Sequence, residues 1–112
     1  MKDDRSYLLH IADAIAQIQS YTGGGHSSFL KDRKTQDAVL RNLMIIGEAA
    51  KKLSKATREK APGTPWKSVS GMRDKMIHEY FGVDLEIVWR TVEVELPKFK
   101  IAVDSLLKES EC

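Results

Sequence analysis

The chain has 112 residues, of which 42% are hydrophobic, 7% aromatic and 30% charged, with a formal net charge of +2. This length favours one domain over residues 1–112, and the balanced charge is weaker than that of a dedicated nucleic-acid binder. One cysteine, no apolar N-terminal signal region and no run of ~20 apolar residues argue against a disulfide scaffold, a secreted protein and a membrane protein. We therefore expect a cytoplasmic protein.

Apolar residues spaced three and four apart predict a first helix from about Asp4 to Tyr21 and a second from about Lys34 to Ser54. The glycine-rich residues 22–28 between them predict a flexible loop. The first stripe consists of Leu8, Ile11, Ile15 and Ile18, and the second of Val39, Leu43, Ile46, Ala50 and Leu53. Further apolar residues beside the second stripe predict that this helix is central in a bundle.

The second half of the chain predicts shorter helical pieces and then a long one. A helical turn at residues 57–60 precedes a proline-rich break, after which Trp66 and Val69 should pack inward. Ser70 is the predicted N-cap of a third long helix that ends near Tyr80 or Phe81.

Asp84 should cap a last helix from about Leu85 to Lys108, which Pro97 should kink or divide. Its apolar positions are Leu85, Val88, Trp89, Val92, Leu96, Phe99, Val103 and Leu106. The fold class is predicted to be all-α, an up-and-down bundle of four to five helices.

The segment 71–80 carries the unusual chemistry. On a helical wheel Arg73 and Tyr80 fall inside an apolar arc of about 140°, where a guanidinium is costly unless it is paired or faces a cleft. His78 lies on another side, one turn after Asp74, whose carboxylate could orient the imidazole. An ordinary explanation stays open: a surface histidine, an arginine that reaches solvent and a core tyrosine.

The spacing Arg73-x4-His78-x-Tyr80 resembles the RxxxxHxY signature of HEPN-domain proteins of the HepT-like family. The resemblance extends over nearly the whole chain. It includes Ile46-Gly47-Glu48-Ala49-Ala50, Pro65-Trp66, Met72-Arg73-Asp74, Val88-Trp89 and Leu96-Pro97.

This resemblance implies a metal-independent endoribonuclease toxin without a cofactor, from a toxin–antitoxin pair of the type II or type VII kind. It implies His78 as general acid or base and Arg73 on the scissile phosphate. Asp74 and Glu48 are implied as supporting residues, although Glu48 falls on a polar side of its helix.

The resemblance also implies partners and control. RNA would be the substrate, and a minimal nucleotidyltransferase would act as antitoxin by transferring AMP to Tyr80. Arg73 and His78 point about 140° apart on one helix, so two copies facing each other are expected to build a shared site in a homodimer. A larger assembly with the antitoxin is also compatible with this arrangement.

A rival hypothesis is a non-catalytic HEPN partner that binds a nucleotidyltransferase or a nucleotide. The intact Arg73–His78 pair favours the enzyme. His10, on the solvent side of the first helix, and His26, in the glycine loop, are not expected to be catalytic, and no metal-ligand spacing is present. The basic residues Lys51, Lys52, Lys55, Arg58 and Lys60 could guide RNA, although a solvated face is the more ordinary interpretation.

Overall fold

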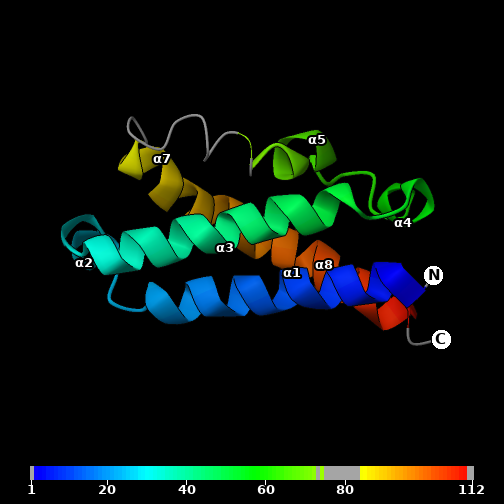
Figure 1. Ribbon diagram of the computed structural model, residues 1–112, viewed down its shortest axis with the longest axis horizontal. Coiled ribbons are helices and arrows are strands. Elements are labelled where there is room, and N and C mark those ends of the chain that lie inside the picture. The colour runs from blue at the N-terminus through cyan, green and yellow to red at the C-terminus, as the bar shows by residue number, and fades with distance from the viewer. Residues whose placement is uncertain (1, 73, 75–83, 111–112) are drawn as a thin grey trace.

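The computed structural model describes residues 2–72, 74 and 84–110, and the described elements are all helical (Figure 1). They are α1 (Lys2–Tyr21), α2 (His26–Lys31), α3 (Arg33–Lys51), α4 (Lys55–Glu59), α5 (Trp66–Ser70), α7 (Leu85–Arg90), the π-helical turn η1 (Thr91–Glu95) and α8 (Leu96–Ser110). The predicted all-α bundle is confirmed. None of the described helices is long and apolar enough to cross a membrane.

α1 and α3 lie side by side and run in opposite directions, with α8 packed across α1 (Figure 1). Every residue of the two predicted apolar stripes is buried in a shared core. Burying a Leu or Ile side chain contributes roughly 1.5–3 kcal/mol, so these two stripes are a main source of the stability of the bundle. The central position predicted for the second helix is confirmed.

A polar cluster fixes the start of α1 against the start of α4. The Asp4 carboxylate is 6% exposed and accepts hydrogen bonds from the backbone N–H of Ser54 at 3.0 Å and from the Ser54 and Thr57 hydroxyls. Burial opposes ionisation, but these hydrogen bonds outweigh it and lower the pKa of Asp4 below 3.8. Ser54 also caps α4 through its side chain.

The prediction of a loop over residues 22–28 is wrong in its second half, because α2 begins at His26. Gly25, with φ of 90°, provides the turn into α2. Phe29 of α2 is 1% exposed and anchors this short helix in the core. Burial of this aromatic ring outweighs the loop tendency of the preceding glycines.

Two further boundaries differ from the prediction. α3 ends at Lys51 rather than at Ser54, because the chain turns there and Ser54 becomes the cap of α4. Ser70 is the last residue of α5, a separate short helix, so it is not the N-cap of the helix predicted after it, most of which lies outside the described residues. Trp66 anchors the start of α5, because its indole N–H donates to the carbonyls of Arg58 and Ala61 at 3.0 Å each.

The last helical stretch is divided, as Pro97 predicts. Asp84 caps α7 by accepting from the N–H groups of Glu86 and Ile87. The Leu96 N–H bonds to the Thr91 carbonyl, five residues back, just before Pro97 in the first turn of α8. Because Pro97 has no N–H and its ring crowds the preceding turn, the helix widens there and then resumes.

Candidate functional site

The start of the predicted motif lies against the C-terminal end of α3. The backbone is helical at Met72 and Asp74, and the exposed Asp74 carboxylate accepts a hydrogen bond from Lys51 Nζ at 3.2 Å. Lys51 is the last residue of α3, where a basic side chain is also favourable toward the helix dipole. This contact holds Asp74 of the motif against the end of α3.

Glu48 lies one turn before Lys51 on α3, so the structure places both predicted supporting residues at the same end of this helix. Its side chain is exposed, which confirms the polar side assigned to it. Glu48 also lines a groove of about 450 Å³ between α1 and α3. The groove is lined by Tyr7, His10, Arg41, Met44, Ile45, Glu48, Ala49 and Lys52.

Arg73, His78 and Tyr80 lie outside the described residues, and so does the predicted end of the third helix near Gly82. The roles of Arg73 in phosphate binding, of His78 in proton transfer and of Tyr80 as AMP acceptor therefore stay predictions. The same holds for the orientation of His78 by Asp74.

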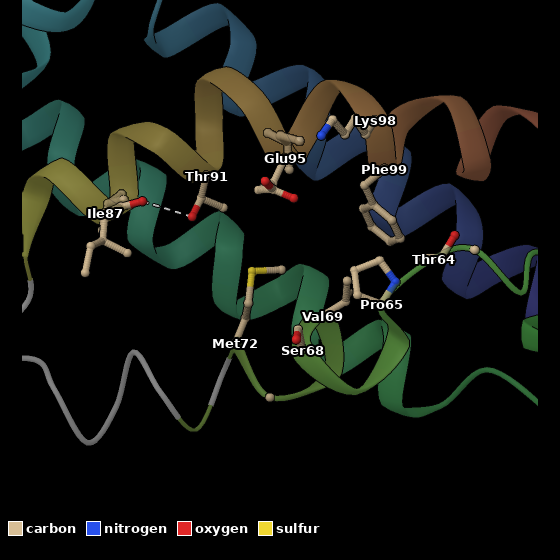
Figure 2. Close-up of a pocket in the computed structure, with 14 residues that line it drawn as sticks. Thr64, Pro65, Ser68, Val69, Met72, Ile87, Thr91, Glu95, Lys98 and Phe99 are labelled. Carbon is tan, nitrogen blue, oxygen red and sulfur yellow. Dashed lines mark hydrogen bonds between the residues drawn. The ribbon is translucent and has the colours of Figure 1, made fainter.

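A second hollow, of about 630 Å³, lies between α5 and the α7–α8 stretch beside Met72 (Figure 2). The Met72 side chain points into it, toward Glu95, and the ring of Phe99 points toward Pro65. Its walls are mostly apolar, and Glu95 and Lys98 are the charged residues among those that line it. Because most of its walls are apolar, the chemistry of this pocket suits apolar contact.

Residues 11–106 of the chain match the family described as Ribonuclease HepT-like. The chain belongs to the HepT-like family. This match covers most of the bundle and includes the whole Arg73–Tyr80 motif. The family predicted from the motif is thereby confirmed.

Similar proteins cover the HepT-like chain from end to end. Two are named "Putative RNase": one from Caldanaerobacter subterraneus, 43% identical over 99% of this chain and 100% of its own, and one from Methanocaldococcus jannaschii, 39% identical over 98% and 96%. The "Probable ribonuclease HepT" of Thermococcus cleftensis is 42% identical over 96% of this chain and 98% of its own. No solved structure gives a significant match.

Two histidines that the sequence set aside have defined surroundings in this HepT-like bundle. His26 stacks on Trp89 with ring centroids 5.4 Å apart and contacts the Glu86 carboxylate, so it ties α2 to α7. His10 is exposed, as expected, but it lines the groove with Glu48. Within the described residues, no group of three His, Cys, Asp or Glu side chains could hold a metal ion.

The groove residues Tyr7 and Arg41 were missed by the sequence analysis. On α3, Arg41, Glu48 and Lys52 are spaced by seven and four residues, which places them within about 40° on one face. That spacing could have indicated a charged helix face from the sequence alone. Its meaning depends on Tyr7 and His10 of α1, which only the tertiary structure brings to the same groove.

Proposed function

We propose that this single-domain HepT-like protein is an endoribonuclease toxin that cleaves RNA without a metal ion. The observation that carries the proposal is the family match over residues 11–106, which includes an intact Arg73–His78 pair. Relatives of nearly the same length bear ribonuclease names, which supports the same activity here. A non-catalytic member would be expected to have lost one of the two residues.

The proposed reaction is attack of a ribose 2′-hydroxyl on the adjacent phosphorus. A base takes the 2′-hydroxyl proton while the O2′–P bond forms, and the P–O5′ bond breaks as the leaving oxygen receives a proton. His78 is assigned to proton transfer because an imidazole can accept and donate near neutral pH. Arg73 is assigned to the phosphate, whose negative charge increases in the pentacoordinate state.

The proposed active form is a homodimer, because Arg73 and His78 are expected to point about 140° apart on one helix. The apolar pocket beside Met72 supports this idea. Ile87 lines that pocket and is 51% exposed, so a second copy could cover apolar surface next to the motif.

The proposed partner is a nucleotidyltransferase antitoxin that adds AMP to Tyr80. The added phosphate would compete with RNA for Arg73, and the nucleotide would block entry to the site. Intact-mass measurement after incubation with the antitoxin, ATP and magnesium should show one AMP on the wild type and none on Tyr80→Phe. Mass addition that persists in Tyr80→Phe would assign control to another residue.

The test of catalysis compares the wild type with His78→Ala and Arg73→Ala on single-stranded RNA in the presence of EDTA. Both variants should lose cleavage and growth inhibition, whereas Arg90→Ala, an exposed arginine on α7, should retain both. Circular dichroism checks the fold of each variant. Cleavage at the wild-type rate by folded His78→Ala would remove histidine from the mechanism.

A further inference from the structure

The groove between α1 and α3, defined above by its eight lining residues, combines two cations with an aromatic ring. Arg41 and Lys52 line it, and neither forms an ion pair among the described residues. By contrast, Lys51 pairs with Asp74 and Arg33 with Asp37 on the same helix. Two cations without an acidic partner among the described residues outnumber the one acid of the groove, Glu48, and so favour an anionic ligand.

Tyr7 supplies a second kind of contact. Its half-buried ring packs on the core, and Lys52 Nζ lies 5.7 Å from its centroid. An ammonium beside an aromatic face matches a nucleotide, which offers a phosphate to the cation and a flat base to the ring. His10, one turn further along α1, extends this aromatic edge of the groove.

The groove reaches the same end of α3 that contacts the start of the motif. Glu48 lines it, Lys52 lines it, and Lys51 between them holds Asp74 at 3.2 Å. Arg41 and Lys52 are 11 positions apart, so the cationic stripe extends roughly 17 Å along α3 from this point. An RNA strand that passes Asp74 could continue along this stripe.

We propose that this groove binds the single-stranded RNA substrate outside the cleaved linkage. Arg41 and Lys52 contact its phosphates, and Tyr7 stacks with a base. This inference rests on the proposed ribonuclease function and extends it to substrate binding. A protein partner is less suited to the groove, because a stable protein interface buries about 800 Å² per partner and this groove is lined by eight residues.

The test is the affinity for a fluorescent single-stranded RNA with 2′-O-methyl groups, measured by anisotropy at several salt concentrations. Methylation blocks the nucleophile, so binding is measured without cleavage. The double variant Arg41→Gln/Lys52→Gln should bind about tenfold more weakly, and its slope of log affinity against log salt should be shallower by about 1.4, for two phosphate contacts.

The matched control Arg90→Gln/Lys34→Gln removes one arginine and one lysine that are exposed elsewhere, and it should bind like the wild type. Tyr7→Leu should weaken binding several-fold through loss of stacking, while Tyr7→Phe should not. Circular dichroism excludes unfolding as the cause.

Equal RNA affinity and equal salt slope in the two double variants would overturn the groove proposal. This holds even if Arg41→Gln/Lys52→Gln loses binding to some other partner. A wild type that does not bind the methylated RNA would also overturn it. Normal binding without cleavage of unmodified RNA would instead contradict the ribonuclease proposal and leave RNA binding in the groove supported.

Discussion

The groove between α1 and α3 and the apolar pocket between α5 and the α7–α8 stretch differ in chemistry, although the pocket is lined by Met72 at the start of the motif and the groove reaches the end of α3 that contacts Asp74. The groove carries Arg41 and Lys52 beside Tyr7, whereas the pocket is walled mainly by apolar residues such as Met72 and Phe99. This difference matches the two proposals, in which the groove binds the charged RNA and the pocket is covered by an apolar protein surface. The predictions below test what each side depends on.

The largest effect on the free energy of unfolding is expected in α3, the helix that packs beside both the groove and the pocket. Leu43 is fully buried in α3, which packs on α1 beside the groove and on α5 beside the pocket. Leu43→Ala should lower the free energy of unfolding by about 2–5 kcal/mol, through lost burial and a cavity. Leu9→Ala removes the same atoms from a side chain that is 48% exposed, and it should change the free energy of unfolding by under about 1 kcal/mol. Chemical denaturation measures both, and equal losses would contradict this account of the core.

A smaller effect is expected at the groove end of α1, where Asp4 lies one turn before Tyr7. Asp4→Asn should cost about 1–3 kcal/mol at neutral pH, because the buried carboxylate accepts from Ser54 and Thr57. Its folded pKa is below 3.8, so this contribution is present above that value and is lost as pH falls through the lower folded pKa. The stability gap between wild type and Asp4→Asn should therefore narrow in acid. Asp13→Asn, at an exposed position, is the control, and a gap independent of pH would reject the role of Asp4.

The core positions and some of the helix ends could be predicted from the sequence. Leu43 and the other stripe residues were identified because helical spacing alone determines which side is buried, and Asp84 and Pro97 act locally on the backbone. The helix at His26 was missed because its stability comes from Phe29 and the stacking on Trp89, which are distant contacts.

The two hollows were missed for a related reason. The charged stripe at Arg41, Glu48 and Lys52 is visible in the sequence, but the aromatic edge of the groove comes from α1. Short motifs were enough to identify the family, and they also carry the prediction, still untested, that Glu48 is a supporting residue. Arg73, His78 and Tyr80 lie outside the described residues, so their arrangement stays a prediction.

The smallest effect tests the pocket side. Ile87→Lys places a charge on an apolar side chain that is 51% exposed, so the fold should persist while the proposed dimer dissociates about tenfold more readily, equivalent to ~1.4 kcal/mol. Ile101→Lys is the matched control, because Ile101 is 72% exposed on α8 and does not line the pocket. Light scattering across a concentration series, under reducing conditions, measures the dimer. An unchanged dimer in Ile87→Lys, or equal weakening in both variants, would place the interface elsewhere.

The central claim is that this chain cleaves RNA without a metal ion, with a 2′-hydroxyl group of the RNA itself as the nucleophile. The most direct test is to incubate the purified chain with a single-stranded RNA in EDTA and to identify the ends of the products by mass spectrometry. The account predicts a 2′,3′-cyclic phosphate on one fragment and a 5′-hydroxyl on the other, with neither formed by His78→Ala. Products with a 5′-phosphate, or cleavage that requires an added divalent metal, would contradict it.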